Sequence, residues 1–176
     1  CGIEWMPKNL DVITFRNGDV IPEITDPVEW VNATGPAWCY PNNDSNNDAT
    51  YGKLYNWYAV NDSRGLAPLG YVIPTVEQWE YYILCIGGVP FVDNTGFYYA
   101  GGYMKESGLD HWQSPNTDAD NRTLWTGLPG GSRNGFTGLF VEPSTTGLFW
   151  TSTEQDDVNA FRFGLVYNTS EITKFG

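Results

Sequence analysis

The stretch Pro74-Thr-Val-Glu-Gln-Trp-Glu-Tyr-Tyr-Ile-Leu-Cys-Ile-Gly-Gly88 carries the clearest structural signal in the chain. Thr75 and Gln78 have the spacing of a capping box, which marks the N-terminus of a helix. Four apolar residues follow at helical spacing: Val76, Trp79, Ile83 and Ile86. The two glycines then end the pattern, so we predict a helix over residues 75–86. Cys85 lies next to the apolar stripe, and we expect a buried, inert thiol there.

Before this helix, the sequence predicts a β-hairpin and a shorter helix. Asn17-Gly18 separates two apolar-alternating runs within residues 11–21, which is a strong hairpin signal. Residues 51–60 form the second helix candidate, because Leu54, Trp57 and Tyr58 share one helical face.

Beyond residue 90, short apolar runs alternate with loops rich in Gly, Asn, Asp and Thr, which is typical of strands. The clearest strand candidates are 139–141, 148–151 and 160–167. The chain has no internal repeat and no linker. We therefore predict one α+β domain over residues 1–176, with two helices, small antiparallel sheets and long irregular loops.

Nine Lys and Arg residues against 21 Asp and Glu give a formal net charge of −12. This charge repels polyanions at long range, so we expect no nucleic-acid partner. The sequence has no run of about 18 apolar residues, so we predict no membrane span. Acidity suits a secreted or cell-surface protein, and we expect an extracytoplasmic location.

Catalytic chemistry has few candidates. His111 is the single histidine, and we prefer a loop-fixing hydrogen bond to a role in a catalytic triad. A glycoside hydrolase needs two carboxylates, but 21 acidic residues supply such pairs by chance. We expect no enzyme, with a glycan-active hydrolase as the most distant alternative.

The polar run 41–50 crowds oxygen ligands into one loop. Calcium takes six to eight oxygen ligands, so Asn43, Asp44 and Asp48 are candidate ligands for Ca²⁺. Asp118, Asp120 and Asn121 form a second such cluster. The alternative, which we prefer, is a solvated loop rich in Asx turns.

Several phrases resemble one known family and occur in its order along nearly the whole chain. They include Trp5-Met-Pro-Lys-Asn-Leu, Ala37-Trp-Cys-Tyr, Tyr51-Gly-Lys-Leu-Tyr-Asn-Trp-Tyr, Leu128-Pro-Gly-Gly-Ser-Arg-Asn and Phe149-Trp-Thr-Ser-Thr-Glu. They resemble the Fibrobacter succinogenes major paralogous domain, within the superfamily of the formylglycine-generating enzyme. The resemblance implies a C-type-lectin-like fold on the surface of Bacteroidota-like bacteria, often in lipoproteins or adhesin-like chains.

The chain also departs from that family. Members usually end in a further strand, whereas this chain stops at Lys174-Phe-Gly, so we expect the final strand to be missing. A missing strand would leave an open sheet edge near residues 1–15, through which neighbouring subunits could join. The sequence has no cysteine after Cys85, which excludes the sulfatase-modifying activity. We expect a Cys1–Cys39 disulfide, with pairing of Cys39 between chains as the alternative.

In the implied fold, the C-terminal half forms the exposed recognition face. Its candidate ligand-binding residues are Trp112, Arg133, Asn134, Trp150, Glu154, Gln155, Asp156, Asp157, Asn159 and Arg162. Aromatic rings beside amide and carboxylate groups suit a glycan or a protein ligand. The competing interpretation places the tryptophans in the core. We therefore predict a non-catalytic recognition module, with a structural subunit of a surface assembly as the alternative.

Overall fold

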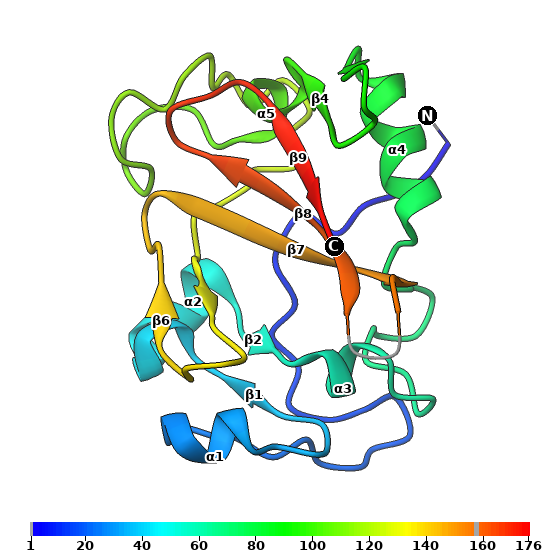
Figure 1. Ribbon diagram of the computed structural model, residues 1–176, viewed down its shortest axis with the longest axis vertical. Helices are drawn as coiled ribbons and strands as arrows, with labels where there is room; N and C mark the ends of the chain where they lie inside the picture. The colour runs from blue at the N-terminus through cyan, green and yellow to red at the C-terminus, as the bar shows by residue number, and fades with distance from the viewer. Residues whose placement is uncertain (1, 157–158) are drawn as a thin grey trace. The chain divides into compact units, whose positions relative to one another are not determined.

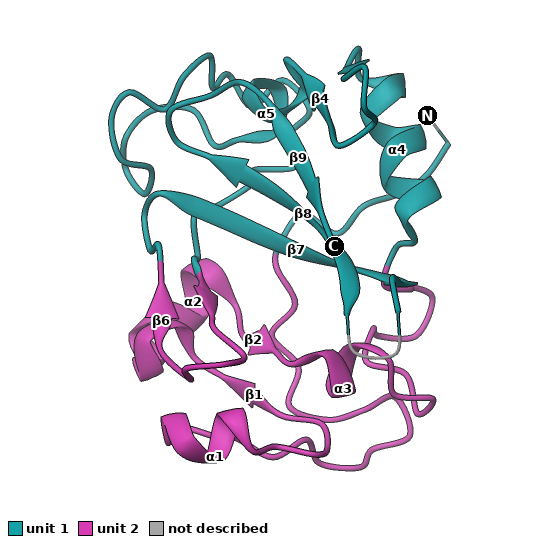
Figure 2. Ribbon diagram, in the orientation of Figure 1, with its two compact units in different colours: residues 1–8, 74–131, 142–176 teal, residues 9–73, 132–141 magenta. Residues whose placement is uncertain are grey.

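The computed structural model describes residues 2–156 and 159–176 (Figure 1). The chain separates into two compact units, which Figure 2 distinguishes by colour. Unit 1 contains residues 1–8, 74–131 and 142–176, and unit 2 contains residues 9–73 and 132–141. Each unit joins segments that are distant in the sequence, so no single cut in the chain separates them. The single domain over residues 1–176 stays a prediction.

Unit 1 is built on a five-stranded antiparallel sheet with the order β3-β4-β9-β8-β7. Its strands are β3 (Val89–Pro90), β4 (Gly96–Tyr98), β7 (Thr146–Glu154), β8 (Ala160–Val166) and β9 (Ile172–Phe175). The sheet edges are β3 and β7. The expected open edge near residues 1–15 is wrong, because residues 2–13 contain no strand. Strand β9 pairs with both β4 and β8, and the expected absence of a further final strand stays a prediction.

Helix α4 (Val76–Cys85) confirms the strongest prediction from the sequence. The Thr75 side chain accepts a hydrogen bond from the Gln78 backbone N–H, and Gln78 Oε1 accepts one from the Thr75 N–H at 2.9 Å. Trp79 and Ile83 are buried in the core of unit 1, where the Trp79 ring stacks on that of Phe163 at 5.2 Å. The capping box and the apolar stripe together therefore define this helix.

Two cysteine predictions are wrong. Cys85 is exposed at the end of α4 and disulfide-bonded, so it is not a buried inert thiol. Cys39 is a free, buried thiol in β1, so the predicted Cys1–Cys39 disulfide does not form. Cys1 itself lies outside the described residues. The prediction for Cys85 failed because this residue adjoins the apolar stripe of α4 in sequence, whereas its side chain lies on the exposed side of the helix.

Unit 2 contains short helices and two small antiparallel ribbons. Its helices are α1 (Pro27–Val31), α2 (Asp48–Tyr51) and α3 (Trp57–Val60), with the 3-10 turns η1 (Pro41–Asn43) and η2 (Ser45–Asn47). Strand β1 (Trp38–Cys39) pairs with β2 (Leu54–Tyr55), and β5 (Ser132–Arg133) pairs with β6 (Phe140–Val141). The 11–21 hairpin is present only as the isolated bridge between Thr14 and Val20.

The predicted helix over 51–60 is wrong, because the segment divides into α2, β2 and α3. Gly52 ends α2 at φ +66°, and a side chain there would meet the Leu10 carbonyl oxygen at 2.6 Å. Asn56 then starts α3, because its Oδ1 accepts hydrogen bonds from the N–H groups of Ala37 (2.9 Å) and Ala59 (3.1 Å). The spacing of apolar residues contains no information about these contacts with distant residues, so it could not predict the breaks in the helix.

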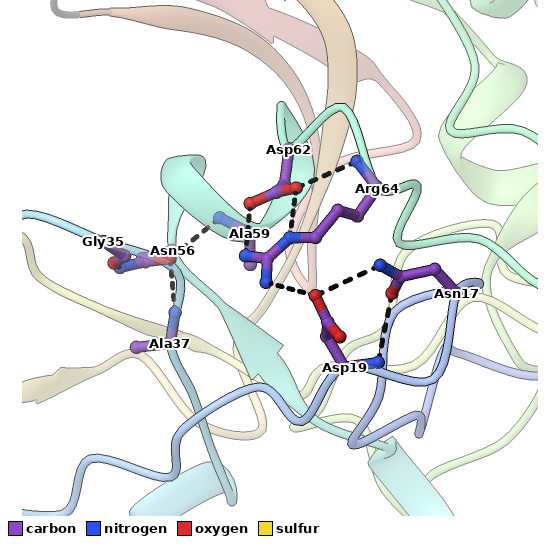
Figure 3. A network of polar contacts seen from close by, with 8 residues as sticks. All are labelled: Asn17, Asp19, Gly35, Ala37, Asn56, Ala59, Asp62 and Arg64. Atoms are coloured by element: carbon purple, nitrogen blue, oxygen red, sulfur yellow. Dashed lines mark hydrogen bonds and ion pairs between the residues drawn. The ribbon is translucent and has the colours of Figure 1, made fainter.

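A polar network holds the loops of unit 2 in place (Figure 3). Arg64 pairs with Asp62 and Asp19, with its Nη1 3.0 Å from Asp19 Oδ2, and its guanidinium lies over the Phe15 ring at 4.1 Å. Asn17 donates to the same Asp19 oxygen at 3.1 Å. Each side chain of this network has at least one protein partner, so we assign the network to structure.

The structure confirms a mixed α/β chain with few helices and small antiparallel sheets. Its fifth α-helix, α5 (Ala100–Met104), lies in unit 1. Among the described residues, no helix has the length and apolar character that crossing a membrane requires.

Candidate functional site

Two of the predicted ligand-binding residues are not available to a ligand. Trp112 is only 2% exposed, and its indole N–H donates to the Gly127 carbonyl at 2.9 Å, so it is a core residue of unit 1. Arg133 in unit 2 is buried and donates to the carbonyl groups of Gly138, Ile24 and Thr25. Both assignments are wrong, because each side chain is used internally.

The other predicted residues divide between the units. Asn134 in unit 2 accepts hydrogen bonds from the N–H groups of Phe136 and Thr137, and so shapes a turn. In unit 1, Trp150 on β7 lies opposite Arg162 on β8, which in turn lies opposite Phe175 on β9. Arg162 is half-buried, and this burial lowers its pKa.

The hairpin between β7 and β8 is exposed at Glu154, Gln155, Asp156 and Asn159. Asn159 Nδ2 donates to both carboxylate oxygens of Asp156 at 3.0 Å, which closes the turn. Asp157 lies outside the described residues. These four side chains are accessible, and their role in binding stays a prediction.

The candidate calcium ligands do not converge. Asn43 Nδ2 donates to the Thr25 carbonyl, Asp44 accepts from the Asn46 N–H in an Asx turn, and Asp48 pairs with Lys53 at 2.7 Å. No group of three or more His, Cys, Asp or Glu side chains in the described part of the chain has an arrangement that holds a metal ion. The contacts match the Asx-turn interpretation.

His111 forms the kind of contact that we preferred for it. Its Nδ1 lies 2.9 Å from both carboxylate oxygens of Glu106, which links α5's C-terminal extension to the following loop. Glu106 and His111 are five residues apart in sequence, so their contact stabilises the loop between them.

A hollow of about 530 Å³ opens on unit 1, outside the predicted recognition residues but lined in part by Asp118 and Asp120 of the second oxygen-rich cluster. We call it the Tyr99 hollow. Its lining residues are Tyr99, Tyr103, Asn116, Asp118, Ala119, Asp120, Arg122 and Ser170. They combine two phenol rings with carboxylate, amide and guanidinium groups. A concave surface with aromatic walls and a few polar groups is the usual form of a small-ligand site.

Helix α5 brings the three segments of the hollow together. Gly101 packs against the Glu171 carbonyl, and Gly102 packs against the Asp118 backbone, so closely that a Cβ at either position would collide. The Gly102 N–H donates to the Ser170 carbonyl at 3.0 Å, and the Gly102 carbonyl accepts from the Asp120 N–H at 3.1 Å. The paired glycines therefore let the chain segments on both sides of α5 approach each other.

Lys105 also connects the chain segments that line the hollow. It is completely buried, and its Nζ donates to the carbonyl groups of Thr117 (3.0 Å), Val166 (3.1 Å) and Thr169 (2.8 Å). Burial lowers its pKa to about 8. One ammonium group thus joins the loop that carries Asp118 to the β8–β9 connection that carries Ser170.

The wall of the hollow is formed by an ordered stack. The Arg122 guanidinium lies 3.9 Å from the centroid of the Tyr103 ring and pairs with the Asp120 carboxylate. This pairing lowers the pKa of Asp120. The Asp118 carboxylate, in contrast, is exposed and makes no hydrogen bond within the described residues, so it is available to an incoming donor.

Two features of the hollow are energetically unfavourable for the folded state. Tyr99 adopts φ +69° and ψ −33° before α5, a left-handed conformation that a bulky residue rarely takes. Asn116 is 5% exposed, and its Nδ2 donates to two carbonyl groups, but its buried Oδ1 finds no partner among the described residues. Backbone strain and orphaned polar atoms gather at functional sites more often than elsewhere.

The fold and the hollow define a small mixed α/β protein with a concave polar–aromatic surface on unit 1. The chain belongs to the family described as the Fibrobacter succinogenes major domain, which it matches over residues 2–174. This match confirms the resemblance carried by the phrases between Trp5 and Glu154. The comparison with curated proteins gave no match, and neither did the comparison with solved structures.

The sequence contained only a partial signal for this site. Asp118 and Asp120 stood out as an oxygen-rich cluster, and Tyr98-Tyr99 is an aromatic pair before a Gly-Gly step. Nothing local indicates that the two stretches meet, because the contacts of Gly101, Gly102 and Lys105 that join them span many residues.

Proposed function

We propose that this protein is a non-catalytic recognition module that binds a neutral glycan in the Tyr99 hollow. The observation that carries the proposal is the combination of an exposed, strained Tyr99 with an exposed Asp118 carboxylate that makes no hydrogen bond within the described residues, in one concave surface. Aromatic rings pack on the apolar faces of sugar rings, and carboxylates accept hydrogen bonds from sugar hydroxyls.

The electrostatics of the chain favour a neutral ligand. A net charge of −12 disfavours anionic ligands at long range, and the one cation in the hollow, Arg122, is already paired with Asp120. Asp118 is a carboxylate acceptor left for a ligand, and the Tyr99 and Ser170 hydroxyl groups of the lining can each donate and accept. A polyhydroxylated ligand supplies the matching donors.

We extend the proposal to the wider setting of the domain. The C-type-lectin-like fold, the extracytoplasmic location and the adhesin-like role that the family resemblance implies are consistent with a glycan-binding surface. The alternative, a structural subunit that accepts a strand from a neighbour, stays a prediction: the described residues near 1–15 offer no strand edge, whereas β3 and β7 are edge strands of the unit 1 sheet.

A glycan-array screen tests the proposal. We expect retention of neutral glycans by the wild-type protein, equally with calcium and with a chelator, because the hollow holds no cluster of metal ligands. Tyr99→Ala should abolish retention, whereas Tyr81→Ala removes an equally exposed tyrosine from α4 and should leave it unchanged. An array without any bound glycan, or equal retention by both variants, would overturn the proposal. Binding of a protein in place of a glycan would favour the alternative that the ligand is a protein.

A further inference from the structure

A row of aromatic side chains continues outward from the Tyr99 hollow. The ring centroids of Tyr99 and Tyr98 are 6.2 Å apart, and those of Tyr98 and Phe91 are 4.4 Å apart. Tyr98 is 42% exposed and Tyr99 is 52% exposed. The three rings are therefore contiguous, with neighbouring planes tilted by 48° and 59°, and they lead from the hollow along the β3–β4 hairpin to the half-buried Phe91.

The hairpin fixes the far end of this row. Phe91 follows β3, and its ring packs on Gly96, where a Cβ would meet the ring at 2.7 Å. Gly96 and Tyr98 lie two residues apart on β4, so they share one face of the strand, while Phe97 is buried on the other face. Strand alternation thus places Tyr98 on the face that the Phe91 ring covers, while Phe91 and Tyr99 themselves lie just outside the strands β3 and β4.

We infer that the ligand is a linear, neutral, β-linked oligosaccharide whose first unit occupies the hollow and whose following units stack on Tyr98 and Phe91. This inference rests on the glycan-binding function proposed above and adds the length of the ligand and its direction. Aromatic rows favour sugars with flat apolar faces, and a linear chain with equatorial linkages presents such faces unit after unit.

The charges along the row support a neutral chain. The row itself contains no ionisable group other than the two phenols, while Asp118 and Asp120 lie at the hollow. The carboxylates accept hydroxyl donors at one end, and the rings outside the hollow add contact area without adding charge selectivity. Each further stacked unit should therefore contribute to affinity until the row ends at Phe91.

Calorimetric titration with β-1,4-linked glucose oligomers of increasing length tests this inference. For the wild-type protein, we expect the dissociation constant to fall with each unit up to about three units and then to level off. Loss of one stacking ring should weaken the longer oligomers about fivefold to tenfold. Tyr98→Ala should remove this gain with length, whereas Tyr99→Ala should weaken the binding of every length, glucose included.

The outcomes separate this inference from the function on which it rests. Tyr81→Ala serves as the matched control, because it removes an exposed tyrosine that has no ring in the row. An affinity independent of length, equal weakening of all lengths by Tyr98→Ala, or no binding of any oligomer would overturn the extended site. If the glycan array is nevertheless positive, the proposed glycan binding in the Tyr99 hollow stands without the extended site on Tyr98 and Phe91. An array without any bound glycan overturns both the glycan binding and the extended site.

Discussion

The Arg122 guanidinium covers one face of the Tyr103 ring at 3.9 Å while it pairs with Asp120. The arrangement holds three side chains of the hollow in one orientation before any ligand arrives. A binding surface that is ordered in advance loses less conformational entropy on association. Asp118, which has no such partner in the described structure, remains as the acceptor for the ligand.

Replacement of Arg122 should therefore affect binding more than stability. We expect Arg122→Ala to weaken glycan binding about tenfold, because Tyr103 and Asp120 lose their common anchor. The denaturation midpoint should barely change, since exposed ion pairs contribute little to folding. Arg122→Lys keeps the charge but loses the planar stack, so it should recover only part of the affinity. Full recovery by lysine would show that charge alone matters.

Tyr99 allows a test that separates function from folding. Glycine adopts a positive φ without strain, so Tyr99→Gly should leave the free energy of unfolding unchanged or raise it by up to about 1 kcal/mol. Glycan binding should be lost in the same variant. The matched control is Tyr81→Gly in α4, which should lower stability by about 1 kcal/mol because helical glycine is unfavourable. A clear loss of stability in Tyr99→Gly would contradict the strain assigned to this position.

Lys105 should make stability depend on pH in the alkaline range. Burial lowers its native pKa to about 8, below its unfolded value of about 10.4. Between these values the unfolded chain binds a proton that the native chain does not, so this group's contribution to stability rises with pH. Below about pH 7 both states are protonated and the contribution is constant.

Denaturation of the wild-type protein and Lys105→Met at pH 7 and pH 9.5 measures this effect. The variant leaves three buried carbonyls without their donor, which should cost about 3 kcal/mol at pH 7. The gap between the two proteins should be wider at pH 9.5. An NMR titration of Lys105 Nζ in the wild-type protein gives the pKa independently. A gap that is the same at both pH values, with a pKa near that of free lysine, would refute the account.

Cys39 should be unreactive in the native protein. Its burial in β1 raises its pKa to about 11, so little thiolate exists at pH 8. Iodoacetamide should alkylate Cys39 only after unfolding in guanidinium, with the modified residue identified by peptide mass mapping. Rapid modification under native conditions would show that the thiol is accessible.

Local patterns predicted the local parts of the structure. Helix α4 followed from Thr75, Gln78 and the apolar stripe, because a capping box and a helical face involve only neighbours in sequence. Strand β8 followed in the same way from its alternation, with Phe163 and Leu165 buried. The Asx turns of the polar loop at 41–50 were also anticipated.

The parts that failed depend on contacts between distant segments. Sequence gave no signal that β9 lies between β4 and β8, because its pairing with Gly96 and Phe97 spans more than half of unit 1's sequence. Trp112 is a residue type that often anchors ligands at a surface. Its indole N–H instead donates a hydrogen bond to the Gly127 carbonyl in the core. The hollow depends on Gly101 and Lys105, whose partners include residues beyond 165, so its location requires the fold.

The most direct test of glycan recognition is a calorimetric titration of wild-type protein and Asp118→Asn with the glycan that the array retains best. Asparagine tolerates the positive φ at this position and preserves the side-chain shape, so the fold is kept. Asp110→Asn, an exposed aspartate outside the hollow, is the control.

We predict that Asp118→Asn binds at least about tenfold more weakly than wild type, because a hydrogen bond to a charged acceptor contributes about 1.5–3 kcal/mol. Asp110→Asn should match the wild-type protein. Dissociation constants within twofold for all three proteins would show that the Tyr99 hollow is not where the glycan binds.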